Sequence, residues 1–156
     1  MSSRSILPIL LLAALAVGCG HPFYPATPKG FVDMGTIYRD GEYRAMTADG
    51  VVLGIRAYDN EPKGELAFWA RALERRVRDM GGYALLEKRQ AKNRGGLVGA
   101  QYRFGHDEGK TPHLYIITLF VTDERIYVLE AGGTKSEMDR QAAQIDWAIA
   151  NFMHKS

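Results

Sequence analysis

The alternation of apolar and polar positions after residue 41 predicts strands interrupted by one helix. Glu42–Thr47 and Val51–Tyr58 have the pattern of strands and flank Ala48-Asp49-Gly50. An Asp-Gly pair is typical of a hairpin turn, because glycine accepts a positive φ. Between residues 64 and 80 the apolar residues recur every three or four positions, which predicts an amphipathic helix ending at Gly81-Gly82. Its expected buried face consists of Leu66, Trp69, Leu73, Val77 and Met80.

Four further strand-like segments and a closing helix complete the pattern. The segments are Tyr83–Lys88, Leu97–Gly105, Leu114–Thr122 and Arg125–Ala131. Their short connections favour an antiparallel meander, and the strongly apolar third segment is expected to lie centrally, covered on both faces. Thr134 and Glu137 have capping-box spacing at the start of the helix. Its expected buried stripe consists of Met138, Ala142, Ile145, Ile149 and Phe152.

The order of hairpin, helix, four-stranded meander and closing helix resembles the PsbP/DcrB-like α/β/α sandwich. The local sequences that carry the resemblance are Gly81-Gly82-Tyr83-Ala84-Leu85-Leu86, Gly95-Gly96-Leu97-Val98-Gly99, Arg125–Ala131 and Ile145–Phe152. We therefore predict an α+β fold in which an antiparallel sheet, made of the hairpin and the meander, packs against two main helices. The resemblance implies non-enzymatic roles, because members of this fold serve as accessory subunits of membrane complexes, small envelope lipoproteins and binding modules.

The first 18 residues have the pattern of an export signal. Arg4 precedes an apolar run, Ile6–Val17, that is shorter than the roughly 20 residues needed to span a bilayer. The run leads into Leu15-Ala16-Val17-Gly18-Cys19, which resembles the lipobox of bacterial lipoproteins, although Ala16 stands where leucine is most frequent. The resemblance implies cleavage before Cys19 and a diacylglycerol on its thiol. The alternative is ordinary secretion with cleavage after Ala16, which leaves Cys19 as a free thiol.

These features predict a signal peptide over residues 1–18, a lipidated cysteine with a Pro-rich tether over 19–30, and a single α+β domain over 31–156. Prolines at positions 22, 25 and 28 favour extended backbone in the tether. The expected location is the cell envelope, lipid-anchored and facing the periplasm. Gly20 follows the cysteine where inner-membrane lipoproteins of enteric bacteria have aspartate, so the resemblance favours the outer over the inner membrane.

Composition restricts the possible partners and chemistry. The formal net charge is only +2 at pH 7, which argues against a nucleic-acid surface. No cofactor-binding fingerprint is complete, and no serine lies in a nucleophile elbow. His106 and His113 are weak candidates for metal ligands, because they flank a predicted turn, His106–Pro112, that includes two acidic residues. The alternative is that this segment is simply a solvated turn.

Two sets of side chains are candidates for an interaction surface. Arg71, Arg75 and Arg78 lie mostly off the apolar face of the first helix and suit lipid head groups or an acidic partner. The alternative is a solvated face balanced by neighbouring acidic residues. Trp147 lies beside the stripe of the closing helix, either at the edge of the core or exposed as an anchor.

The favoured hypothesis is a non-catalytic, lipid-anchored binding or accessory subunit of a membrane or periplasmic complex. Its expected partners are the membrane, through the lipid, and another envelope protein. An alternative is a small-ligand carrier with a pocket between sheet and helix. A metal-dependent hydrolase is the third hypothesis, and it lacks a convergent catalytic set.

Overall fold

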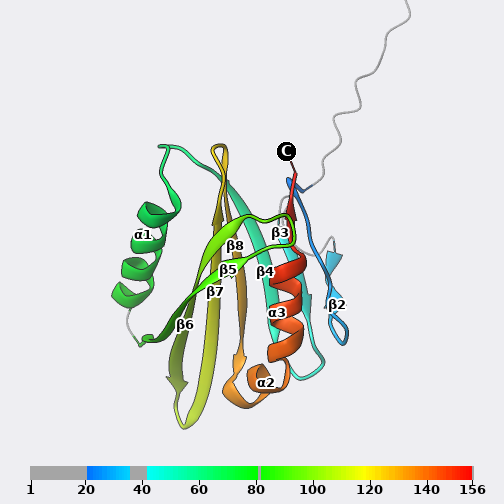
Figure 1. Ribbon diagram of the computed structural model, residues 1–156. Helices are drawn as coiled ribbons and strands as arrows, with labels where there is room; N and C mark the ends of the chain where they lie inside the picture. Colours follow the sequence, from blue (N-terminus) through cyan, green and yellow to red (C-terminus); the bar gives the residue numbers. More distant parts are fainter. Residues whose placement is uncertain (1–20, 36–41, 81, 156) are drawn as a thin grey trace, which may run out of the picture.

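The computed structural model describes residues 21–35, 42–80 and 82–155, so the predicted signal peptide, Cys19 and Gly20 lie outside it. Within these ranges a seven-stranded antiparallel sheet has the strand order β2-β3-β4-β8-β7-β6-β5, and a second, two-stranded sheet pairs β1 with β9 (Figure 1). The elements are β1 (Phe23–Tyr24), β2 (Val32–Asp33), β3 (Glu42–Met46), β4 (Val52–Asp59), α1 (Leu66–Asp79), β5 (Ala84–Lys92), β6 (Val98–Glu108), β7 (Thr111–Val121), β8 (Arg125–Thr134), α2 (Lys135–Arg140), α3 (Ala142–Asn151) and β9 (Met153–His154).

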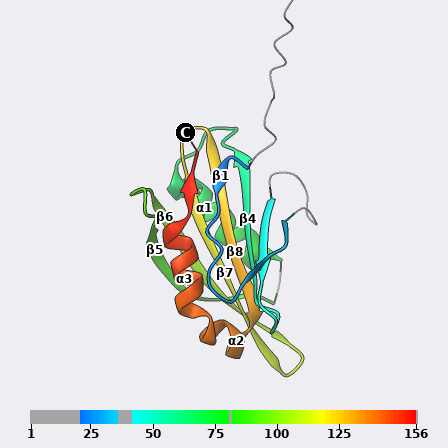
Figure 2. The same ribbon diagram turned by 90° about the vertical axis from the view of Figure 1, so that its right-hand side faces the viewer.

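Helices cover both faces of the large sheet, which makes an α/β/α sandwich (Figure 2). The alternating side chains of β7 and β8 divide between two cores. One core lies under α2 and α3 and includes Ile145, Ile149 and Phe152. The other lies under α1 and includes Val77 and Ile117. The predicted α+β class and its antiparallel sheet are confirmed.

The hairpin and the meander form one sheet, because β4 pairs with β8. The hairpin turn contains Gly50 at φ +86°, as the Asp-Gly pair predicts. The predicted loop His106–Pro112 is wrong. β6 and β7 pair as far as Glu108 and Thr111, so the turn is confined to Gly109 and Lys110. The polar residues of this segment predicted a loop, but they belong to strands, because the exposed end of a hairpin needs no apolar face.

The segment after residue 20 is not a free tether. Phe23 is 1% exposed and packs against Tyr127 and Phe152, with ring centroids 6.4 and 6.0 Å away. The backbone beside it pairs with β9, and the amide of Lys155 donates to the carbonyl of Pro22 at 3.0 Å. Within the segment predicted as a tether, Pro22, Phe23 and Tyr24 therefore contact the domain.

The helices depart from prediction at their ends. Met80 caps α1 outside its last turn and is 64% exposed instead of buried. The closing helix divides into α2 and α3 at Gln141, which turns the chain so that Met138 and Ile145 both reach the core. Thr134 caps α2 through its hydroxyl, as predicted, but Glu137 pairs with Arg140 instead of reaching back. None of the helices in the described ranges is long and apolar enough to cross a bilayer.

The outer strand β5 has an irregular and charged edge. Its pairing with β6 shifts register between Leu85 and Glu87, and Leu86 at that bulge is exposed. Charged side chains follow along the strand at Lys88, Arg89 and Lys92. A bulge and lysines on an edge strand are features that discourage pairing with another chain.

Neighbouring residues Phe23 and Tyr24 provide a matched test of the N-terminal packing. Phe23→Ala should lower the free energy of unfolding by about 3–5 kcal/mol, because it opens a cavity in the aromatic core. Tyr24→Ala should change it by less than about 0.5 kcal/mol, because Tyr24 is 59% exposed. Urea denaturation of the non-lipidated domain measures both values, and equal effects would contradict the packing of β1.

Candidate functional site

A groove lies between α1 and the large sheet. Among the described residues, α1 packs over β6 and β7 and covers the same face of β4 and β8 only in part. Two hollows result, of about 550 and about 390 Å³, and they share Arg56, Tyr115 and Glu130. We call them together the α1 groove. The larger hollow is lined by Arg56, Tyr58, Leu73, Arg76, Val77, Met80, Tyr83, Tyr115, Ile117, Val128 and Glu130.

The position of α1 depends on Asn60, a buried residue just after β4. Its side-chain amide donates to the carbonyls of Gly64 and Thr122 at 3.0 and 2.9 Å. Its side-chain oxygen accepts from the amide of Gly64 and from Nε1 of Trp69, at 2.9 and 2.8 Å. One side chain therefore joins the start of α1 to the β7–β8 turn. The sequence pattern did not predict this role of Asn60, because two of its partners, Thr122 and Trp69, become neighbours only in the fold.

Two glycines leave space at the floor of the smaller hollow. Gly54 on β4 and Gly132 on β8 both line it. A Cβ at Gly54 would approach only the carbonyl oxygen of Tyr43, at 3.8 Å, and one at Gly132 would have its nearest neighbour, in the Tyr115 ring, at 3.5 Å. Neither position requires glycine for packing. The absence of side chains here leaves space beside Arg56 and Glu130.

The polar groups shared by the two hollows satisfy one another. The Arg56 guanidinium pairs with one oxygen of the Glu130 carboxylate, and the Tyr115 hydroxyl donates to the other. Burial, and then the nearby Glu130 charge, raise the pKa of Tyr115 well above its ordinary value of 10. Tyr115 is therefore neutral at neutral pH, and its hydroxyl proton is held by Glu130.

His106 and His113 face each other across β6 and β7. His106 Nδ1 lies 2.8 Å from the carbonyl of Gly82, and its ring stacks on Tyr83. His113 Nδ1 lies 3.1 Å from the carbonyl of Thr111, with Glu108 3.7 Å from Nε2. Among residues 21–35, 42–80 and 82–155, no group of three His, Cys, Asp or Glu side chains is placed to hold a metal ion.

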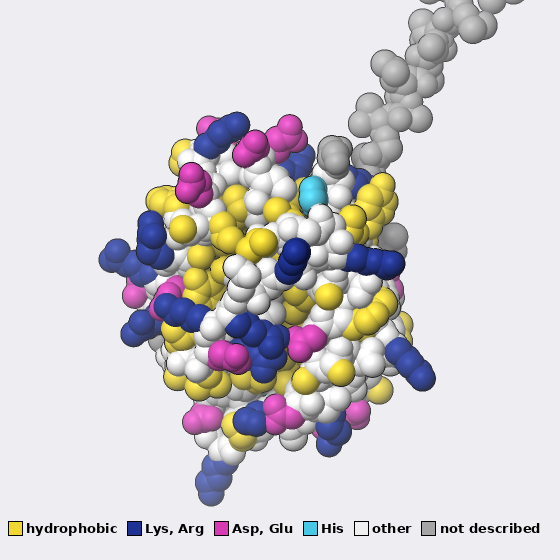
Figure 3. Space-filling model, in the orientation of Figure 1, with side chains coloured by type: hydrophobic (Ala, Val, Ile, Leu, Met, Phe, Trp, Pro, Cys, Tyr) yellow, Lys and Arg dark blue, Asp and Glu magenta, His cyan; other side chains and the backbone are white. Residues whose placement is uncertain are grey.

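The candidate interaction residues lie on opposite faces of the sheet. Arg71, Arg75 and Arg78 belong to α1, whereas Trp147 belongs to α3 and is 47% exposed. Two of the arginines pair along the helix, Arg75 with Asp79 and Arg78 with Glu74, both at 3.6 Å. On the face that carries α3, basic and acidic side chains are interspersed (Figure 3).

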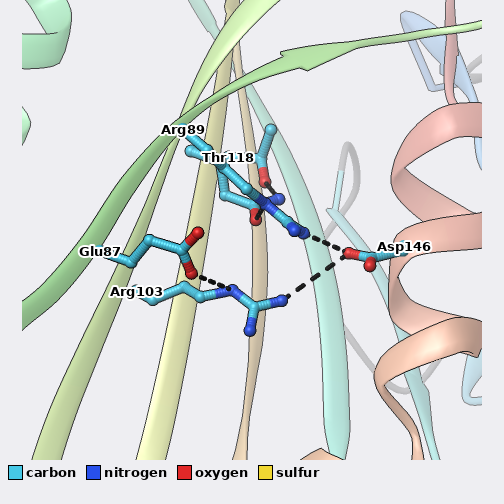
Figure 4. Close-up of polar contacts among 6 residues, drawn as sticks. Glu87, Arg89, Arg103, Thr118 and Asp146 are labelled. Atoms are coloured by element: carbon cyan, nitrogen blue, oxygen red, sulfur yellow. Dashed lines mark hydrogen bonds and ion pairs between the residues drawn. The ribbon is translucent and has the colours of Figure 1, made fainter.

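A second polar cluster fastens α3 to the sheet (Figure 4). Arg89, Gln101 and Thr118 are direct cross-strand neighbours on β5, β6 and β7 and are hydrogen-bonded in a row. Asp146 of α3 pairs with Arg89 at 2.5 Å and lies 3.9 Å from Arg103. Sequence analysis predicted none of this cluster, because its members become neighbours only through strand register. Its charges are paired, so we assign it to stability.

Known structures define the fold of this domain. It is similar to LpqN, which is involved in cell envelope biogenesis of Mycobacterium tuberculosis, with a TM-score of 0.70 over 86% of this chain and 83% of LpqN at 9% identity. It is also similar to the Saccharomyces cerevisiae Ran-binding protein Mog1p, with a TM-score of 0.59 over 85% of this chain and 90% of Mog1p at 12% identity. Cyanobacterial PsbP from Synechocystis has a TM-score of 0.56 over 85% of this chain and 86% of that protein at 13% identity.

These similarities confirm the predicted PsbP-like fold. At such low identities they show the fold alone. No protein-family model matches the chain, and no curated protein matches it in sequence.

The raised pKa of Tyr115 predicts a loss of stability at alkaline pH. The folded domain holds this proton more tightly than the unfolded chain, so the stabilisation is complete below about pH 10 and declines as the pH rises further. Tyr115→Phe should therefore reduce the fall in unfolding free energy between about pH 8 and about pH 11. Urea denaturation at both values measures it. The other buried tyrosines are common to both proteins, and an unchanged fall would contradict the assignment.

Proposed function

We propose that this chain is a lipid-anchored, non-catalytic binding domain of the bacterial cell envelope, which serves as an accessory subunit of a membrane or periplasmic complex. The observation that carries the proposal is the α1 groove, a hollow between helix and sheet whose lining includes the exposed apolar side chains Tyr58 and Met80. Exposed apolar surface gathered in a groove is typical of a binding site. Its shared polar groups, Arg56, Tyr115 and Glu130, are paired with one another.

The lining indicates the chemistry of the partner. Leu73 and Val77 of α1 and its capping residue Met80 provide an apolar wall, and Tyr58 also lines the groove and is half-exposed. Arg76 also lines the groove and has no ion pair among the described residues. Apolar side chains beside one unpaired cation suit a protein segment that presents an apolar or aromatic residue next to a carboxylate. Such a contact combines burial of apolar area with a charge-assisted hydrogen bond.

The structural neighbours are consistent with a binding role. Mog1p is a Ran-binding protein, so this architecture is used for protein association elsewhere. LpqN is involved in cell envelope biogenesis. The leader of this chain predicts that it is located in the cell envelope. The lipid anchor at Cys19 and the preference for the outer membrane rest on the sequence around Cys19.

Small-ligand carriage is a second candidate, favoured by the size of the larger hollow. Its volume of about 550 Å³ lies within the range of about 300–1,000 Å³ that is usual for small-molecule sites. A further site for a protein partner is the outer surface of α1 with Arg71, Arg75 and Arg78, or the exposed Trp147 on α3. Because these surfaces are separate from the groove, substitutions distinguish them.

Two arginines of α1 allow a matched test of the groove. Cross-linking in intact envelopes, followed by capture and mass spectrometry, should recover a stoichiometric protein partner. Arg76→Glu should reduce its recovery at least about tenfold, the loss expected for one charge-assisted contact of roughly 1.4 kcal/mol or more. Arg71→Glu makes the same charge change on the same helix outside the groove, and recovery should persist. Loss with Arg71→Glu alone would move the site to the outer surface of α1.

A second variant fills the groove without changing its charge. Gly54→Val places a β-branched side chain on β4, where a Cβ fits, so the free energy of unfolding should stay the same or rise. Partner recovery should nevertheless fall, because the added methyl groups occupy the smaller hollow. Full recovery with both Gly54→Val and Arg76→Glu would contradict a protein site in the groove. Recovery of the protein alone in every sample would favour small-ligand carriage.

The anchor has a separate test. Cys19→Ala removes the only thiol and hence the only site for the lipid. The processed variant should move from the membrane to the soluble periplasmic fraction, because a formal net charge of +2 gives only weak attraction to anionic lipids. Immunoblotting of separated fractions measures the shift. Continued membrane retention of processed Cys19→Ala would show that the lipid is not the main anchor.

A further inference from the structure

We infer that the end of the domain formed by β1, β9 and the β7–β8 turn borders the membrane surface, with Tyr24 and Lys155 in the lipid headgroup layer. This inference rests on the proposed lipidation of Cys19. We call this end the anchor end, and the end with the β6–β7 turn at Gly109 and Lys110 the far end.

The chain between the proposed lipid and the packed domain is short. The carbonyl of Pro22 accepts from the amide of Lys155, and the next residue, Phe23, is buried. Pro22 is three positions after Cys19, so this part of the chain extends over at most about 11 Å. β7 alone has 11 residues and is about 37 Å long. The link is thus much shorter than the domain and holds the anchor end close to the bilayer.

The surface at the anchor end carries side chains that suit a membrane interface. Tyr24 is exposed, and the ammonium group of Lys155 lies over its ring, 4.8 Å from the centroid. An aromatic ring with a polar tip and a long cationic side chain are the groups that proteins place at the membrane interface. β1 and β9 present the pair side by side at the C-terminal end of the described chain (Figure 2).

Charge attraction contributes little to this orientation. Lys155 lines a shallow hollow together with Arg125, Asp123, Glu124 and His154, so acidic groups offset the basic ones. Arg125 in addition pairs with Asp59 at 3.0 Å. The anchor end therefore meets the bilayer because of the short link and the Tyr24–Lys155 pair. The orientation should persist at high salt, where a polybasic contact would weaken.

Energy transfer from the protein to the lipid headgroups tests the orientation. The lipidated full chain is placed in nanodiscs of phosphatidylethanolamine and phosphatidylglycerol that carry an acceptor dye on the headgroup. A donor dye is attached to Glu124→Cys at the anchor end or to Lys110→Cys at the far end. Cys19 is the only native cysteine and lipidation blocks its thiol, so the introduced cysteine is the only free one. Transfer should be at least about twofold more efficient from position 124, given the ~37 Å between the ends.

Matched substitutions test the role of the pair. Combining Tyr24→Ala with Lys155→Ala should reduce the difference between the two donor positions. Leu86→Ala removes a similarly exposed apolar side chain near the far end and should leave the difference unchanged. Equal transfer from both positions would overturn the orientation, and an unchanged difference in the double variant would overturn the assignment to Tyr24 and Lys155.

Mass spectrometry of the N-terminal peptide distinguishes a failure of the lipid anchor from a failure of the orientation. A diacylglycerol on Cys19 together with equal transfer would overturn the orientation and leave the lipid anchor intact. An unmodified Cys19 would overturn both.

Discussion

Phe152 packs against β1, near the start of the described chain, and against the two central strands β7 and β8. Its ring centroid lies 5.5 Å from Phe120 of β7, 5.3 Å from Tyr127 of β8 and 6.0 Å from Phe23 of β1. These aromatic contacts bury large apolar areas and prefer defined geometries. The other face of β7 and β8 forms the floor of the α1 groove. The positions of the side chains that line the groove therefore depend on this aromatic cluster.

The two faces of the sheet are covered unequally, and this difference explains why a groove exists. The face under α3 also receives α2 and the β1–β9 pair, and it closes over a continuous core. Of the elements in the described part of the chain, α1 alone covers the other face, and it reaches β6 and β7. Successive residues of β8 show the contrast: Leu129 is fully buried under α3, whereas Val128 and Glu130 line the groove. The same strand thus stabilises the fold on one side and presents a surface on the other.

Local patterns were sufficient to predict the main helices and most of the long strands, but not the short strands β1, β2 and β9 or the contacts between elements. The Asp49-Gly50 turn and the helical spacing before Gly82 are signals that neighbouring residues carry by themselves. Phe23 was assigned to a tether, because its burial depends on partners more than 100 residues away. The groove was equally inaccessible to prediction. It depends on how far α1 extends across the sheet, and on the β4–β8 register that places Gly54 opposite Glu130.

The edge of β5 has a consequence for a protein concentrated on a membrane. The proposed lipid anchor would confine the domains to a thin layer and raise their local concentration. At that concentration, neighbouring copies could pair along the open edge of the nine-residue strand β5. The register shift beside Leu86 interrupts the pairing edge of this strand, and its charged side chains would have to lose water for a second strand to dock there. The edge of β5 therefore disfavours pairing between copies of the domain.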